Sequence, residues 1–215
     1  MISPTSGRYE YGVPGKSLSS MSGTFGEGRV NSGVEGELRT ADLLRHLQGG
    51  RRPQNRFTVV HDVVIKTSRV TVNLDHVVVA GNEVFIIDSK VWYPGVILTL
   101  QGRTWIYRPK NIRDEYHGGL QRAEYLDGQA LRAEEQMLKQ WLSSNHIIAR
   151  VNQPIMVVWP TKNKRHPNTR LYRPRNGEKV LHGGDRARRY LDSAIPNKAA
   201  NSLVLDCVVR LCSHG

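Results

Sequence analysis

The 215-residue sequence has few cysteines, few aromatic residues and no long apolar run. Its two cysteines lie five positions apart near the C-terminal end, which fits neither a disulfide-stapled scaffold nor a zinc or redox motif. No stretch reaches the roughly 20 apolar residues of a membrane-spanning helix, and residues 1–20 lack the apolar segment of a signal peptide. These absences predict a cytoplasmic protein that does not enter the membrane.

Acidic residues are also scarce relative to basic ones. Asp and Glu total 19 against 31 Lys and Arg, a formal net charge of +12. The 39% of hydrophobic residues are enough to build a core, which excludes a disordered polyelectrolyte. The charge therefore predicts a polyanionic partner, although the total alone does not distinguish DNA from RNA, an acidic protein or a membrane surface.

The positive charge is concentrated near the C-terminal end. Residues 161–190 contain ten basic residues and two acidic ones. Tyr172 and Tyr190 lie among them, and their rings could stack on bases or sugars. This pattern favours a nucleic-acid-binding segment over a solvated basic loop. The residues assigned to nucleic-acid binding are Lys162, Lys164, Arg165, Arg170, Arg173, Arg175, Arg186, Arg188 and Arg189.

Composition divides the chain into three parts. Residues 1–32 are rich in Gly, Ser and Pro and predict a flexible N-terminal arm. Residues 33–160 carry the regular apolar patterns of a folded core, and residues 161–215 are expected to form a basic extension that packs on it. No internal repeat is evident.

Helical and extended patterns alternate along the predicted core and its extension. Strands are predicted at 57–65, 70–79, 84–91 and 155–159, with a further extended pair at 96–100 and 104–107. Helices are predicted at 33–48, 119–142, 184–191 and 198–211. This order indicates a mixed α/β fold.

The Gly81-Asn82 pair is a strong signal for a hairpin turn. Counting outward from this turn places Asp75 directly opposite Asp88, where two like charges are destabilising. Close carboxylates are the ligands that Mg²⁺ uses, with waters and substrate phosphate completing its shell. Lys90 would lie beside such a site, where it could orient a water or stabilise phosphate charge. An Asp–Lys pair that closes a strand at the surface is the alternative, and spacing alone does not decide.

Glu37 favours the functional interpretation. On a helix it shares a stripe with Ala41 and Leu44, so its carboxylate is expected to face the core. An acid on an apolar stripe is uncommon unless it has a partner. Interaction with the positive end of the helix dipole is the alternative role.

The segments Gly33-x-x-Gly36-Glu37, Asp75-His76 and Asp88-Ser89-Lys90, in this order and strand context, form a recognisable combination. It resembles the nuclease-related domain (NERD) family, a branch of the restriction-endonuclease-like PD-(D/E)xK nucleases. The resemblance covers roughly residues 32–160. It implies an α/β fold with a restriction-endonuclease-like mixed central sheet flanked by helices, and it makes residues 33–160 a nuclease core whose hairpin carries the active site.

The resemblance also implies a role for individual residues. Asp75 and Asp88 match the metal-binding carboxylates, Lys90 the catalytic lysine and Glu37 the helix glutamate that completes the site. The resemblance also matches Gln129 to a glutamine common on the helix after the hairpin. The chain departs from the family pattern in two places: Asn73 stands where an acid is frequent, and Asp88 is the shorter of the two acids allowed at its position.

The resulting hypothesis is a Mg²⁺-dependent deoxyribonuclease, with Mn²⁺ as a substitute cation. A non-cleaving nucleic-acid-binding or recruiting module with the same fold, or a nuclease acting on RNA, are the alternatives. Sequence specificity and endonucleolytic or exonucleolytic action are left open. The oligomeric state is also open, although cleavage of both strands would suit a homodimer. His76 is expected to face away from Asp75 and to serve packing or hydrogen bonding.

Overall fold

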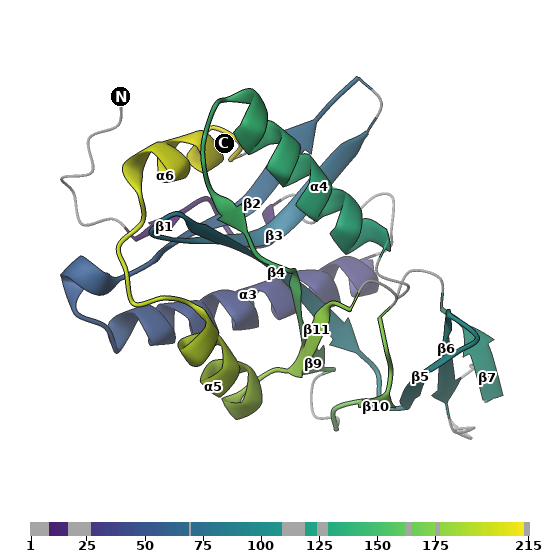
Figure 1. Cartoon of the computed structure of the whole chain (residues 1–215). Helices are drawn as coiled ribbons and strands as arrows, with labels where there is room; N and C mark the ends of the chain where they lie inside the picture. Colours follow the sequence, from purple (N-terminus) through teal and green to yellow (C-terminus); the bar gives the residue numbers. More distant parts are fainter. Residues whose placement is uncertain are drawn as a thin grey trace.

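The computed structural model describes residues 9–16, 27–68, 70–108, 119–123, 129–161, 165–174 and 177–212. A mixed sheet forms the centre of the molecule, with strand order β1-β2-β3-β4-β9-β11 and β8 paired to β4 (Figure 1). Its strands are β1 (Glu10–Tyr11), β2 (Thr58–Lys66), β3 (Thr71–Ala80), β4 (Glu83–Trp92), β8 (Arg150–Val151), β9 (Ile155–Pro160) and β11 (Lys179–His182).

Helices cover both faces of this sheet (Figure 1). Helices α3 (Glu27–Gly49) and α5 (Asp185–Ala194) lie on one face, and α4 (Gln129–Ser144) and α6 (Ser202–Val209) lie on the other. A short 3-10 helix, η2 (Pro53–Asn55), precedes β2. The predicted mixed sheet flanked by helices is therefore confirmed. No helix in the described ranges is long and apolar enough to cross a membrane.

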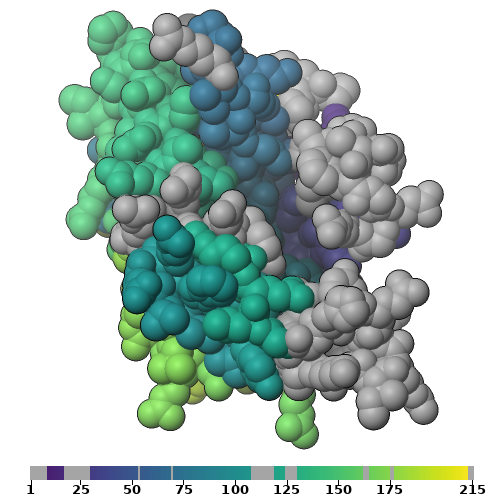
Figure 2. All heavy atoms as spheres, turned by 90° about the vertical axis from the view of Figure 1, so that its right-hand side faces the viewer, coloured from purple at the N-terminus to yellow at the C-terminus, as the bar shows by residue number. Residues whose placement is uncertain are grey.

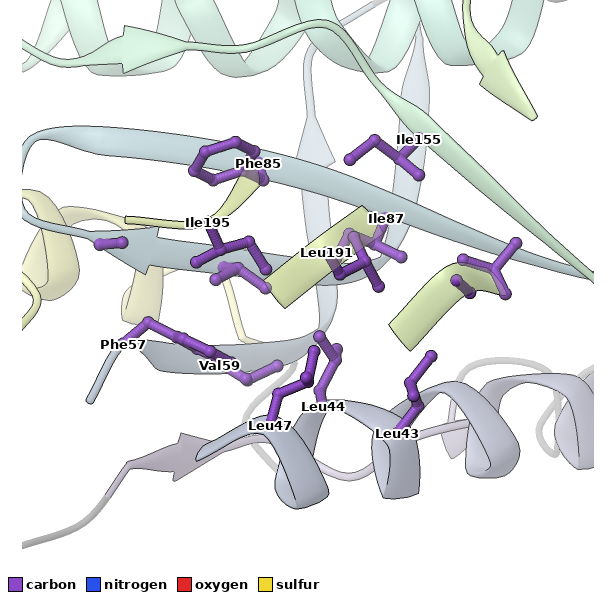
Figure 3. Packing of buried hydrophobic residues seen from close by; sticks show 14 of the residues in the cluster. Leu43, Leu44, Leu47, Phe57, Val59, Phe85, Ile87, Ile155, Leu191 and Ile195 are labelled. Carbon is purple, nitrogen blue, oxygen red and sulfur yellow. The ribbon is translucent and has the colours of Figure 1, made fainter. Parts of the chain in front are cut away.

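Two apolar layers hold the helices on the sheet. Leu43, Leu44 and Leu47 of α3 pack toward Phe57 and Ile87 on the first face, together with Leu191 and Ile195 at the end of α5 (Figure 3). On the second face, Leu138 and Leu142 of α4 and residues of α6 pack on Val77 and Val79. The alternation of side chains along β3 and β4 thus supplies both layers, because successive residues face opposite sides of the sheet.

The β3–β4 hairpin has the predicted register. Ala80 pairs with Glu83 and Val79 with Val84, and Gly81 adopts a φ of 60° in the turn. A glycine suits this position because side chains disfavour a positive φ. The pairing with β3 continues to His76 and Ile87, and from Ile87 onward the other edge of β4 pairs in parallel with β9. The predicted central position of the apolar 155–159 strand is also confirmed.

A second, smaller sheet follows the hairpin. Its strand order is β10-β5-β6-β7, and its strands are β5 (Val96–Leu100), β6 (Arg103–Arg108), β7 (Gly119–Arg122) and β10 (Asn168–Leu171). The predicted helix at 119–142 is wrong over its first residues, because 119–122 pairs with β6 and the helix begins at Gln129. Strand pairing with a distant segment overrides the local helical pattern here.

The N-terminal region also differs from the prediction. Helix α3 begins at Glu27, six residues before the predicted start. Residues 9–16 contain β1, which pairs in parallel with β2. After β1 the segment reaches α3, where Gly15 contacts Glu37. The predicted arm at 1–32 therefore contains two structured segments. Beyond 161, β11 extends the main sheet while α5 and α6 each cover one of its faces.

Close packing of α3 against β4 depends on Gly36. A Cβ atom at this position would lie 2.8 Å from Cγ2 of Val91, which is closer than normal contact. We expect Gly36→Ala to lower the free energy of unfolding in urea by about 1–3 kcal/mol, because α3 or Val91 must shift. Gly49→Ala is the matched control in the same helix, since nothing lies within 4 Å of its Cβ position. Equal effects of the two substitutions would show that this close approach is unimportant.

Candidate active site

The structure brings Asp75, Asp88 and Lys90 together where β3 and β4 stop pairing. The backbone N–H of Ser89 donates to Oδ2 of Asp75 at 2.8 Å, and Nζ of Lys90 donates to Oδ1 of Asp88 at 2.5 Å. The Asp88 side chain is 6% exposed and the Lys90 side chain 37%. The lysine therefore lies at the mouth of the site, with one aspartate buried beneath it.

The electrostatics of this cluster reflect two acids placed close together. The pKa of Asp75 is raised from 3.8 to about 7, mainly by burial and then by the negative charge of Asp88. Burial alone would lower the pKa of Lys90, but the charges of Asp88 and Asp75 outweigh it and raise this pKa above its usual value. The acids of this cluster thus favour a positive group beside them.

Glu37 reaches this cluster from α3, as its position on the helix predicted. Its side chain is 1% exposed and lies on the same face of α3 as buried Ala41 and Leu44. Its Oε2 accepts a hydrogen bond from the backbone N–H of Gly15 at 2.7 Å. Burial, and next the charge of Asp75, raise its pKa from 4.5 to about 8.

Glu134 on α4 is a member of the site that the sequence interpretation missed. It is 8% exposed, and its pKa is raised well above the usual value by burial and then by the charges of Asp88 and Asp75. It lies three residues after Leu131 and four before Leu138 on the buried face of α4, so the reasoning applied to Glu37 would have found it. The side chain of Gln129, proposed for this helix from the family resemblance, lies outside the described residues.

The donors of this cluster suit a hard cation that keeps part of its water shell. Among the side chains that the structure describes, no three His, Cys, Asp or Glu residues converge closely enough to enclose a metal ion. Oδ2 of Asp88 and Oε2 of Glu134 are nevertheless buried and accept no hydrogen bond from the described residues. Because Mg²⁺ is usually held by one or two carboxylates plus waters and substrate phosphate, Asp75 and Asp88 fit this group.

A chain of buried polar side chains supports β4 on the side opposite to Asp75 and Asp88. His76 faces away from Asp75, as predicted, and its Nε2 lies 3.1 Å from Oγ of Ser89. Its Nδ1 lies 2.7 Å from Nδ1 of His61, whose Nε2 lies 2.8 Å from Oε1 of Glu10. Ser89 Oγ also lies 2.7 Å from Oγ1 of Thr40. Burial lowers the pKa of both imidazoles, so neutral rings can share one hydrogen bond between their Nδ1 atoms.

This chain should make Ser89 more important than its small size indicates. Ser89→Ala removes the group that links His76 to Thr40 and leaves polar atoms of both without that partner. We expect a loss of about 1–3 kcal/mol in the free energy of unfolding, measured in urea at pH 7.5. Ser68→Ala at an exposed serine is the matched control and should stay within about 0.5 kcal/mol of the unchanged protein. A loss no larger than the control's would show that the chain is not a structural support.

Only some of the basic residues predicted to bind nucleic acid lie close together in the structure. Arg170, Arg173 and Arg186 line a cavity of about 600 Å³, together with Tyr172 and His182. Glu178 lines the same cavity. Arg165 and Arg189 are exposed, and Arg188 forms an ion pair with Asp185 at 3.2 Å. Lys162, Lys164 and Arg175 lie outside the described residues.

Strand register relates this cavity to Lys90. Lys90 of β4 pairs with Val158 of β9, which in turn pairs with His182 of β11. Paired residues face the same side of a sheet, and neighbouring strands are about 4.8 Å apart. His182, which lines the cavity, and Lys90 therefore face the same side of the main sheet, with their backbones about 10 Å apart across the strands.

Comparison with known proteins adds one finding to this geometry. Neither a curated protein nor a solved structure matches the chain significantly. The family model for the nuclease-related domain matches residues 32–158, more than half of the chain. The matched region contains Glu37, the β3–β4 hairpin, Glu134 and most of β9. The chain therefore belongs to the nuclease-related domain (NERD) family.

Proposed function

We propose that this protein is a Mg²⁺-dependent nuclease that hydrolyses phosphodiester bonds in DNA. The observation that carries the proposal is the junction of β3 and β4. There burial, and next the charge of nearby Asp88, raise the pKa of Asp75 to about 7. Lys90 contacts Asp88, and one buried oxygen of Asp88 accepts no hydrogen bond from the described residues. Family membership makes a nuclease-related activity the first one to test.

Each residue has a distinct role in this proposal. When bound, the cation would lower the pKa of a water ligand and neutralise charge on the phosphate. Asp75 and Asp88 would hold it, with Glu37 and Glu134 as further acids around it. Lys90 would exchange its contact with Asp88 for the attacking water or the scissile phosphate, because the lysine is the exposed member of the pair.

Basic side chains near the site would hold the DNA backbone. Arg170 and Arg186 line the cavity that also contains His182, and neither forms an ion pair with a described residue. Each phosphate neutralised releases condensed cations, so affinity should fall steeply as salt rises. Cleavage of both strands would suit a homodimer, which sedimentation of the purified protein measures directly.

The test is incubation of the purified protein with plasmid DNA, linear DNA and RNA in Mg²⁺, Mn²⁺ or EDTA. Cleavage of DNA with either metal and none in EDTA is expected. Cleavage that persists in EDTA, or no cleavage of any DNA substrate under all metal conditions, would contradict the proposal. Preferential cleavage of RNA would replace DNA by RNA as the substrate.

A non-cleaving nucleic-acid-binding module is the second candidate. It is favoured by the lack of a three-ligand metal cluster among the described residues and by Asn73 at a position where the family often has an acid. This alternative predicts salt-dependent DNA binding that is equally tight in Mg²⁺ and EDTA, without hydrolysis. The same incubation, followed by a gel-shift measurement, separates the two candidates.

A further inference from the structure

The small sheet has one buried face and one partly exposed face, on which Trp105 is half-buried. Ile97, Thr104 and Ile106 face inward and pack near Met156 and Val158 of β9. The opposite face, here termed the platform face, carries mostly apolar and aromatic side chains. It consists of Val96, Leu98, Leu100, Arg103, Trp105, Tyr107, Leu120, Arg122 and Leu171.

Strand register places Trp105 at the centre of the platform face. Leu98 lies directly across from Trp105 on one side and Arg122 on the other, and Leu171 pairs with Leu98 beyond. Tyr107 is two residues along the same strand, about 7 Å from Trp105. Tyr107 is 46% exposed, and Leu120 and Leu171 are 49% and 60% exposed. Figure 2 shows the teal segment that contains β5, β6 and β7 at the surface of the molecule.

The charge of this sheet has a single sign. The sequences of β5, β6, β7 and β10 contain four arginines and no aspartate or glutamate. Docking of the platform face on a second copy of itself would bring Arg103 and Arg122 toward like charges, which disfavours a symmetric dimer through this surface. The complementary occupant is a polyanion with flat apolar groups.

We propose that the platform face binds the unpaired bases of single-stranded nucleic acid by stacking on Trp105 and Tyr107. Every base offers a flat π-face to an aromatic ring, and arginines nearby attract the phosphates. In a duplex these base faces are already stacked on one another, so the platform face selects single strands or unpaired regions. This binding is sequence-tolerant.

The position of the sheet connects this binding to the candidate active site. Val96 at the start of β5 is only six positions after Lys90, so at most about 20 Å of chain joins them. A strand held on the platform face can therefore extend toward Lys90. The role of this surface in presenting substrate rests on the proposed function, whereas binding itself does not require hydrolysis.

The experiment measures fluorescence anisotropy of a labelled oligothymidylate of about 12 nucleotides, with EDTA present so that no cleavage occurs. Trp105→Ala and Tyr107→Ala are each expected to weaken binding by about five- to 100-fold. Trp105→Phe should recover most of the affinity, because it keeps a ring. Leu203→Ala is the control for truncation of an apolar side chain, since Leu203 is 66% exposed on α6, away from the small sheet.

A second pair of variants avoids any dependence on aromatic packing. Leu100 is 50% exposed on the platform face, so Leu100→Glu and Leu100→Gln should both fold and differ only in charge. The glutamate variant is expected to bind at least fivefold more weakly than the glutamine variant. If the Trp105, Tyr107 and Leu100 variants all bind oligothymidylate within twofold of the unchanged protein, the inference is overturned. It is also overturned if they change only self-association in sedimentation or binding to an acidic protein.

Failure of the proposed function would give a different result. In that case the unchanged protein would bind oligothymidylate in EDTA and lose affinity in the Trp105 variant, yet cleave no nucleic acid when Mg²⁺ or Mn²⁺ is added. That outcome supports the platform face and rejects hydrolysis. Cleavage with no effect of the platform variants on binding gives the reverse conclusion.

Discussion

Lys90→Ala is expected to reduce Mg²⁺-dependent DNA cleavage by roughly 100- to 1,000-fold, the usual cost of removing one group that stabilises developing charge. Binding of DNA in EDTA should change by no more than a few fold, because the basic side chains around the cavity remain. Initial cleavage rates and a gel-shift titration measure the two effects separately. A large loss of cleavage rate with unchanged DNA binding would show that Lys90 acts in the chemical step.

The control for this substitution is Lys139→Ala. Lys139 is 50% exposed on α4 and pairs with Glu135, so its removal tests the general loss of a positive charge. Lys90→Ala also leaves Asp88 without its cationic partner, so its thermal unfolding must be measured alongside. Lys90→Met keeps the length and apolar stem if the alanine variant is unstable. Cleavage at an unchanged rate in both Lys90 variants would contradict the proposed mechanism.

Asp75→Asn is expected to abolish cleavage and, without metal, to make the protein more stable than its parent. At low pH the carboxyl is protonated in both states and the substitution gives little advantage. From about pH 4 to pH 7 the unfolded chain loses a proton that folded Asp75 retains, so the parent loses stability relative to the variant. The rise from 3.8 to about 7, at about 1.36 kcal/mol per pKa unit, sets an upper limit of roughly 4 kcal/mol.

Urea unfolding of both proteins in EDTA between pH 4 and pH 8 measures this difference. It should grow up to about pH 7 and level off above it, where folded Asp75 is ionised as well. The asparagine can still accept the N–H of Ser89, so the hydrogen bond that holds this side chain is preserved. Adding Mg²⁺ at pH 8 should raise the melting temperature of the parent more than that of the variant. A stability difference that does not change with pH would contradict the electrostatic account.

These two substitutions address the same physical conflict. Asp75, Asp88, Glu37 and Glu134 place acidic groups in a buried cluster with Lys90 as a cationic partner. Burial of like charges opposes folding unless a positive group offsets it. A cation bound beside these acids would reduce their mutual repulsion. The same acids therefore affect both the stability of the fold and the proposed chemistry.

Local patterns predicted the part of the site that lies within short segments. The turn at Gly81 fixed which residues of β3 and β4 face each other, and the helical stripe turned Glu37 inward. Glu134 was missed because the family resemblance pointed to Gln129 on this helix, although Glu134 shares the buried stripe of Leu131 and Leu138. The segment 119–122 is a strand only because β6 pairs with it, and such pairing is not encoded in the segment itself.

The sequence by itself determined the hairpin register, the inward direction of Glu37 and the excess of positive charge, because each depends on local periodicity or on composition. Tertiary structure decided which distant groups meet. It brought Glu134 to the aspartates, linked Glu10 to Ser89 through two buried histidines, and placed half-buried Trp105 on the outer face of a second sheet. Contacts of this kind form only when separate helices and strands pack, and the free energy of that packing is shared by residues far apart in the chain.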